Sequence, residues 1–101
     1  MSPRPHENPA ARDELWEAAD WYENPATGQR LLDAAKATRK LIKKWPEASP
    51  VVDGWEGEPV LRWKVVAGFP YRVVYYVKDG RVFIVAYAHT SREPGYWLSR
   101  I

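Results

Sequence analysis

The chain has 101 residues, of which 46% are hydrophobic and 28% are charged, so we expect one domain with a single modest core. It contains no cysteine, which excludes disulfides and thiolate metal sites, and its net charge of +2 does not by itself indicate nucleic-acid binding. No segment approaches the roughly 20 apolar residues of a membrane span, so we expect a cytoplasmic protein with no membrane partner.

The chain opens on a polar stretch and then a predicted helix. Residues 1–8, MSPRPHEN, are rich in proline and predict a loose arm or a weak edge strand. Asn8 and Pro9 suit the cap and the first position of a helix. The apolar residues that follow share one helical face as far as Asn24-Pro25, where this helix is expected to end: Ala11, Leu15, Ala18, Ala19 and Tyr22. Its acidic residues, Asp13, Glu14, Glu17 and Asp20, are expected on a solvated face.

A second amphipathic helix is predicted from about Thr27 to Trp45, with its lysines and arginines mostly off the apolar stripe. The two helices, joined by a short connection, predict an antiparallel helical hairpin. Pro46 ends the second helix, and residues 46–59 contain three prolines and two glycines. This composition predicts a loop before the next element.

The pattern then changes from helical to alternating. Residues 60–66 place Leu61 on one face of a strand and both Arg62 and Lys64 on the other. Residues 71–78 and 81–88 predict two strands joined by Asp79-Gly80, a typical two-residue hairpin turn.

Such a turn fixes the register of the hairpin. We expect Lys78 opposite Arg81, Tyr75 opposite Ile84, Val73 opposite Ala86 and Arg72 opposite Tyr87. One face, expected to pack under the helices, carries Val73, Tyr75, Val77, Val82, Ile84 and Ala86. The other carries Arg72, Val74, Tyr76, Phe83, Val85 and Tyr87, and becomes a basic, aromatic surface if Arg62 and Lys64 share it. The predicted fold class is α+β, a helical hairpin packed on a three- or four-stranded antiparallel sheet.

The residues best suited to catalysis are mostly basic. Phosphate-loop, dinucleotide and zinc motifs are missing, and with two histidines we expect neither a metal nor a cofactor. RNA cleavage needs a base near the 2′-hydroxyl, positive charge at the scissile phosphate and an acid for the leaving oxygen. The candidates for these roles are Arg62, Lys64, Arg72, Arg92, His89 and Tyr96.

Structural roles are the alternative for the same residues. Arg62 and Lys64 suit the solvated face of a strand, Arg72 suits an ion pair, and His89 suits a hydrogen-bonding role at a strand end. We expect Trp97 to fill the core and Arg100 to pair with a carboxylate on a helix.

Two strings resemble a known family. FPYRVVYYV (Phe69–Val77) and VFIVAYAHTSREPGYWLSR (Val82–Arg100) resemble toxins of the RelE/ParE superfamily from bacterial type II toxin–antitoxin modules, among them plasmid stabilisation proteins. Many members have a Phe-Pro-Tyr-Arg strand, an Asp-Gly or similar turn, a strand ending in Ala-x-x-His and a tail of the type Arg-x-Pro-x-Tyr-Trp-x-x-Arg. NPAARDELWEAADWYE (Asn8–Glu23) is similar to the opening helix of the family, which usually also has a preceding strand. The resemblance covers roughly residues 8–101.

The resemblance implies the fold predicted above and a growth-inhibiting toxin neutralised by a cognate antitoxin. In the branch that cleaves mRNA on the ribosome, function rests on sheet cations with a late Arg and Tyr. The matching positions here are Arg62 and Lys64 (with one residue inserted at the Ala67–Pro70 turn), Arg72, Arg92 and approximately Tyr96. The branch that inhibits DNA gyrase lacks a working ribonuclease set and more usually has a histidine where His89 stands. The sequence mixes both patterns, so mRNA cleavage, gyrase inhibition and an inactive relic that only binds antitoxin all stay open.

Two tryptophans are candidates for the antitoxin contact. Trp16 and Trp21 fall off the main apolar stripe of the first helix. Because aromatic residues dominate binding energy at interfaces, we expect both to anchor an antitoxin segment that crosses the helical hairpin and a sheet edge.

Overall fold

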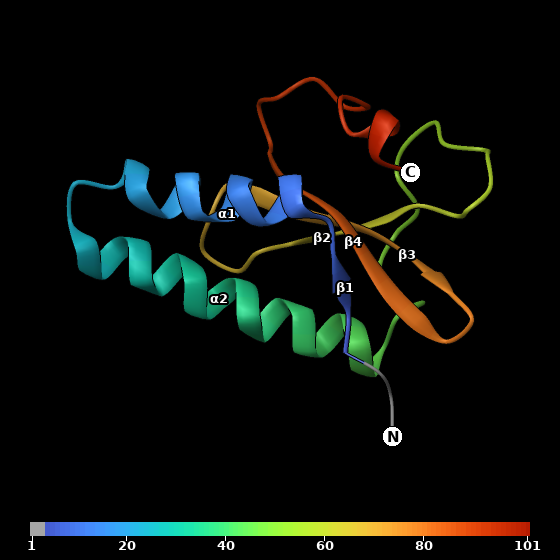
Figure 1. The fold of residues 1–101 in the computed structure, drawn as a ribbon, viewed down its shortest axis with the longest axis horizontal. Coiled ribbons are helices and arrows are strands. Elements are labelled where there is room, and N and C mark those ends of the chain that lie inside the picture. The colour runs from blue at the N-terminus through green and yellow to red at the C-terminus, as the bar shows by residue number, and fades with distance from the viewer. Residues whose placement is uncertain (1–3) are drawn as a thin grey trace.

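Two helices lie across one face of a four-stranded sheet in the computed structural model, which describes residues 4–101 (Figure 1). The α+β class and the helical hairpin are therefore confirmed. A tail, residues 90–101, follows the last strand and contains a short 3-10 helix. The elements in chain order are β1 (His6–Glu7), α1 (Pro9–Trp21), α2 (Pro25–Lys44), β2 (Arg62–Val65), β3 (Tyr71–Lys78), β4 (Arg81–His89) and η1 (Leu98–Arg100).

The same Asn-Pro pair begins both helices. The side chain of Asn8 accepts a hydrogen bond from the backbone N–H of Ala10 at 2.9 Å, and Asn24 accepts one from Ala26 at 2.9 Å. Each cap satisfies an N–H group that lacks a helical partner, and the proline that follows has no N–H to satisfy. The start of α1 is as predicted, whereas α2 begins two residues before the expected Thr27.

The sheet is mixed, and the prediction of a wholly antiparallel sheet is wrong at one edge. The strand order is β1-β4-β3-β2, with β1 parallel to β4 and the other neighbours antiparallel. A long connection of α1, α2 and two strands separates β1 from β4. This connection allows β1 to pair with the free edge of β4 in a parallel orientation. The predicted weak edge strand is thus present at His6–Glu7; residues 1–3 of the predicted arm lie outside the described residues.

A β-bulge changes the outer half of the β3–β4 hairpin. Near the Asp79-Gly80 turn the register is as predicted, with Tyr75 opposite Ile84. The register then shifts between Val74 and Tyr75, so Arg72 lies opposite Ala88 and not Tyr87. Val73 correspondingly pairs with Tyr87 and not Ala86. Because one extra residue exchanges the faces of the residues beyond it, Tyr87 turns toward the helices and Ala86 toward the opposite face.

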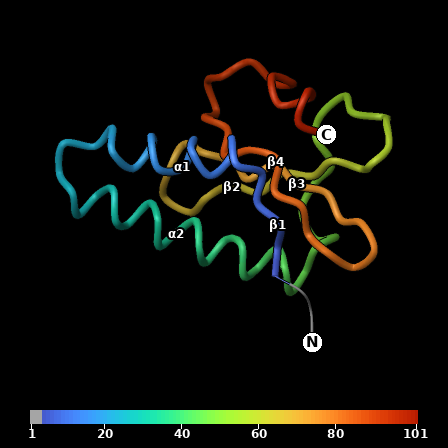
Figure 2. Tube along the Cα trace, viewed as in Figure 1, coloured from blue at the N-terminus to red at the C-terminus, as the bar shows by residue number. Residues whose placement is uncertain are grey.

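Both faces of the sheet carry a core, which corrects the expectation of a single one. Under the helices, α1 and α2 pack on residues that include Val73, Tyr75 and Ile84. On the opposite face the 46–61 loop and the tail come together, as the chain trace shows (Figure 2). This second core contains Val52, Leu61, Val74, Val85, Ala86, Ala88 and Trp97. The sheet is therefore the middle of three layers.

The basic, aromatic surface expected on the face away from the helices does not form. Arg62 lies opposite Tyr75 and Lys64 opposite Val73, and these two partners pack under the helices. Because directly opposed residues share a face, Arg62 and Lys64 lie on the helix side of β2 while Arg72 lies on the other side. The sequence fixes the alternation within β2 but not which face meets the helices.

The two helices approach most closely at Gly28. A Cβ atom added there would lie 2.5 Å from the carbonyl oxygen of Ala19. Alanine normally favours a helix by about 1 kcal/mol over glycine, but here it would push the helices apart. We therefore expect Gly28→Ala to lower the free energy of unfolding by about 1–3 kcal/mol in urea denaturation. Gln29→Ala, at the exposed neighbouring position, should change it by less than about 0.5 kcal/mol; a stabilised Gly28→Ala protein would contradict this packing.

Candidate functional site

Three of the residues selected from the sequence line one groove between α1 and the segment that follows β4. This α1–tail groove has a volume of about 500 Å³, and its lining includes Trp21, Tyr71, His89 and Arg92. Glu14 and Glu17 of α1 contribute its acidic side. The groove is thus aromatic and of mixed charge, which suits contact with another macromolecule more than it suits a phosphate.

Glu14 joins the tail to the helical layer. Its carboxylate accepts hydrogen bonds from Arg100 Nη1 at 2.7 Å, from the Tyr96 hydroxyl at 2.5 Å and from Arg92 Nη1 at 3.4 Å. The backbone N–H of Tyr87 also donates to it at 3.3 Å. The predicted pairing of Arg100 with a helix carboxylate is confirmed. The expectation that Glu14 belongs to a solvated face is wrong, because its side chain is only 13% exposed.

Arg92 and Tyr96 form a stacked pair beside this carboxylate. The guanidinium carbon of Arg92 lies 3.6 Å from the centre of the Tyr96 ring, and the Arg92 side chain is 56% exposed. Such a contact holds the arginine while leaving part of it free for a partner. The Tyr96 hydroxyl, in contrast, is occupied by Glu14.

Tyr96 and Tyr87 both have raised pKa values. Burial, and then hydrogen bonding to Glu14, raises the pKa of Tyr96 above its ordinary 10.0. Burial, and then hydrogen bonding to Glu7, does the same for Tyr87. A raised pKa means that the folded state favours the neutral hydroxyl. The resulting stability is complete below pH of about 10 and is lost as the pH rises further.

We expect the free energy of unfolding to fall steadily when the pH is raised from about 9 to about 11. Tyr96→Phe has no proton to lose at this position, so its stability should depend less steeply on pH than that of the original chain. Urea denaturation at several pH values measures both slopes. Equal slopes would show that Tyr96 ionises as readily in the folded chain as in the unfolded one.

His89 is held by its neighbours at the end of β4. Its ring packs edge-on against Tyr71, with centroids 5.1 Å apart, and its Nδ1 accepts the backbone N–H of Ser91 at 3.0 Å. Accepting this bond places the proton of the neutral ring on Nε2. The geometry matches the hydrogen-bonding role that the sequence left open for a histidine at a strand end.

Of the remaining candidate cations, Arg72 lies close to His89 and Arg92, whereas Arg62 lies elsewhere. Arg72 stacks on Trp63, with its guanidinium carbon 4.4 Å from the ring centre, and it lines with His89 and Arg92 a hollow of about 20 Å³. That volume is about the size of a single water molecule. Arg62 donates to the carbonyl of Ser49 at 2.7 Å and ties β2 to the preceding loop. The six candidates for catalysis are therefore divided between the two faces of the sheet.

Both tryptophans proposed as anchors are exposed, Trp16 by 53% and Trp21 by 77%. They do not share one patch. Trp21 borders the α1–tail groove, whereas Trp16 borders a second hollow, of about 360 Å³, where it meets Leu32 of α2. A partner that contacts both must cross α1.

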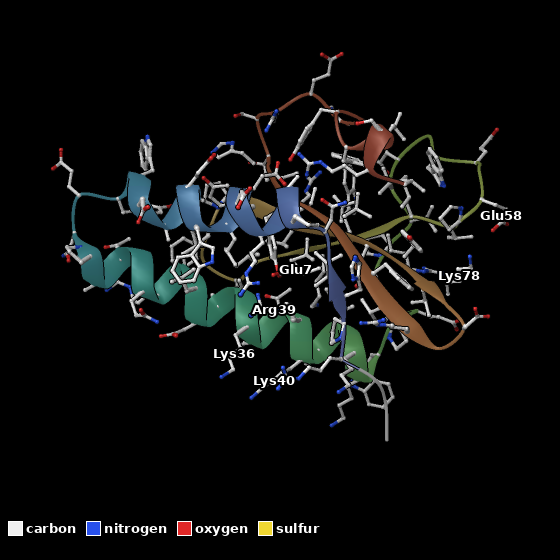
Figure 3. All side chains as sticks on the ribbon, viewed as in Figure 1. Glu7, Lys36, Arg39, Lys40, Glu58 and Lys78 are labelled. Atoms are coloured by element: carbon white, nitrogen blue, oxygen red, sulfur yellow. The ribbon has the colours of Figure 1, made fainter. Side chains whose placement is uncertain are left out.

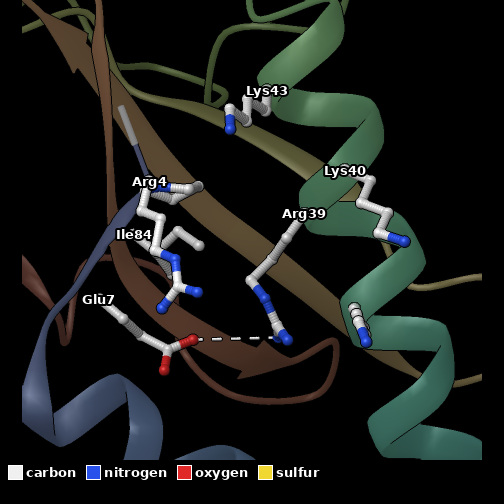
Figure 4. Close-up of a pocket in the computed structure, with 8 residues that line it drawn as sticks. Arg4, Glu7, Arg39, Lys40, Lys43 and Ile84 are labelled. Carbon is white, nitrogen blue, oxygen red and sulfur yellow. Dashed lines mark ion pairs between the residues drawn. The ribbon is translucent and has the colours of Figure 1, made fainter. Parts of the chain in front are cut away.

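A basic groove between α2 and β1 was not predicted. It has a volume of about 490 Å³, and Figure 4 shows Arg4 and Lys43 beside it, Glu7 facing Arg39, and Lys40 on the side of α2 away from β1. The spacing of the lysines on the predicted helix is visible in the sequence. The β1 side of the groove could not be predicted from the sequence, because its position depends on which strand β1 pairs with.

No family model matches the sequence, and no curated protein matches it either. Within residues 4–101, no helix is long and apolar enough to cross a membrane, and no three side chains of the metal-binding types gather into a site.

Proposed function

We propose that this chain is the toxin of a bacterial type II toxin–antitoxin module of the RelE/ParE kind, and that it inhibits its target by binding. The observation that carries the proposal is the way the family-like segments interlock. Arg92, Tyr96 and Arg100 of the tail motif all contact Glu14, which lies in the segment similar to the family's opening helix. In addition, β1 supplies the preceding strand that the family usually has.

Binding is favoured over RNA cleavage by the placement of the cations. Cleavage needs its cations, base and acid around one phosphate. Arg62 and Lys64 lie on one face of the sheet and Arg72 on the other, and the Tyr96 hydroxyl is engaged with Glu14. DNA gyrase is accordingly the target that we propose, with Trp21, His89 and Arg92 of the α1–tail groove as its contact. The cytoplasm is the corresponding location.

Inducible expression in a bacterium tests this function. We expect growth to stop and plasmid supercoiling to change while ribosome-bound mRNA stays intact. Arg92→Ala should weaken the growth arrest, whereas Lys78→Ala, an exposed cation on the far end of the hairpin, should not. Cuts in translated mRNA that disappear in Arg72→Ala and Arg92→Ala would establish the ribonuclease mode instead. Normal growth with normal supercoiling would identify an inactive relic.

The proposed antitoxin is the product of a neighbouring reading frame, and Trp16 and Trp21 are its proposed anchors. Replacing both with alanine should raise the dissociation constant of the complex at least about ten-fold, because anchor residues contribute more than about 1 kcal/mol each. Trp45→Ala is the matched control, since Trp45 is similarly exposed, at 60%, and lies at the other end of the hairpin. Calorimetric titration measures all three affinities, and an unchanged value for the double variant would exclude this placement.

A further inference from the structure

The strongest unexplained feature is the charge of the α2–β1 groove. Helix α2 carries six cations and one acidic residue, Asp33. Four of these cations, Lys36, Arg39, Lys40 and Lys43, line the groove together with Arg4, against a single carboxylate. Figure 3 shows Lys36 and Lys40 projecting from α2 on the side away from Lys78. So much positive charge at one recess attracts anionic partners.

The one carboxylate in the groove already has partners. Glu7 accepts a hydrogen bond from the Tyr87 hydroxyl and lies 3.9 Å from Arg39 Nη1. Arg39 is fixed in turn, because the same Nη1 donates to the Tyr87 hydroxyl at 2.9 Å. Glu7 therefore repels an incoming anion little, and it holds one arginine in place for that anion.

The groove continues toward an exposed aromatic ring. The hollow that contains Trp16 shares Glu7, Lys36 and Arg39 with the basic groove and adds one cation, Arg12, and one carboxylate, Asp33. Lys43 and Lys36 are about 10 Å apart along the helix axis, so the cations form a row along the groove. A row of cations that leads to an exposed aromatic ring is the arrangement by which proteins hold a single nucleic-acid strand without reading its sequence.

We propose that the α2–β1 groove binds single-stranded nucleic acid, with backbone phosphates on Lys36, Lys40, Lys43 and Arg39 and a base stacked on Trp16. An acidic peptide suits the groove less well. The apolar lining of its basic part is limited to Pro5 and Ile84, and β1 offers only two residues for strand pairing. The site is separate from the α1–tail groove, so this proposal does not rest on toxicity. It shares Trp16 with the proposed antitoxin contact, so the antitoxin and the nucleic acid would compete.

Fluorescence anisotropy with labelled mixed-sequence oligonucleotides of about 12 residues, one RNA and one DNA, tests the proposal. If four phosphates are neutralised, the logarithm of the association constant should fall against the logarithm of salt concentration with a slope of about −3. Replacing Lys36, Lys40 and Lys43 together by glutamine should reduce that slope by about 2 and weaken binding at least about ten-fold. Glutamine suits an exposed helix nearly as well as lysine, and circular dichroism verifies the fold.

Single variants separate this site from a general charge effect. Lys40→Gln should weaken binding, whereas Lys78→Gln, which removes the same charge from an exposed position at the far end of the hairpin, should not. Trp16→Ala should weaken binding about ten-fold by removing the stacked base. Equal effects of the two lysine variants, or no binding at low salt, would overturn the proposal.

A competition experiment distinguishes nucleic acid from an acidic protein segment. If oligoglutamate of equal charge displaces the oligonucleotide at equal concentration, the ligand is an acidic protein segment instead.

Discussion

Glu14→Gln should release the tail from α1 and lower the free energy of unfolding by about 3 kcal/mol. Glutamine keeps the size of the side chain but removes the charge that faces Arg100 at 2.7 Å, where both side chains are largely shielded from water. Removing one partner of such a pair leaves the other charge without compensation. The Tyr96 hydroxyl loses its charged acceptor at the same time.

The matched control for this variant is Glu17→Gln, one helical turn away and exposed. We expect a change of less than about 0.5 kcal/mol for it in urea denaturation. A double-mutant cycle that combines Glu14→Gln with Arg100→Met separates the direct interaction from general effects of either change. Equal stability of the two glutamine variants would show that the tail is held by its apolar contacts alone.

Trp97→Ala should have a still larger effect, about 3–5 kcal/mol, because it removes the largest side chain from the second core. Trp97 is 2% exposed and packs edge-on against Trp63 and Tyr96, with ring centroids 6.3 Å and 5.3 Å apart. Trp45→Ala removes an equally large but 60% exposed ring and should cost much less.

Trp97→Phe separates the effect of packing from the effect of the indole N–H group. Among the described residues, the buried Nε1 of Trp97 has no hydrogen-bond partner. Phenylalanine keeps an aromatic ring and removes this unsatisfied donor, so part of the lost packing energy is offset. We expect less than half the loss seen for Trp97→Ala. Equal losses in thermal or urea denaturation would show that Nε1 is satisfied in solution.

Local signals in the sequence were sufficient for the helices and for the inner half of the hairpin. The Asn8-Pro9 pair and the Asp79-Gly80 turn act within a few residues of themselves, so they depend little on distant contacts. The β-bulge in β4 carries no such signal. It exchanged the faces of Ala86 and Tyr87 and moved the residue opposite Arg72 by one position.

The candidate site was predicted less completely, because it depends on contacts between distant segments. The residue types of Trp97 and Arg100 indicated their roles, but nothing in the sequence of the first helix distinguishes Glu14 from its acidic neighbours. Glu14 differs only because the tail, about 80 residues later, folds over it. The placement of Arg62 and Lys64 failed for the same reason, since the face of an edge strand is set by its neighbour.

The three-layer arrangement also determines which part of the fold unfolds first. The tail is fastened to the helices chiefly at one carboxylate, while β3 and β4 pair along their whole length in the middle layer. We expect the tail to open before the β3–β4 pair, and its detachment uncovers the part of the second core that Trp97 fills while the helical side stays packed. In hydrogen exchange, amide protons of residues 96–101 should exchange well before those at the centre of β3. Such partly opened molecules, with an apolar sheet surface uncovered, would be the first targets of proteases and the first to aggregate.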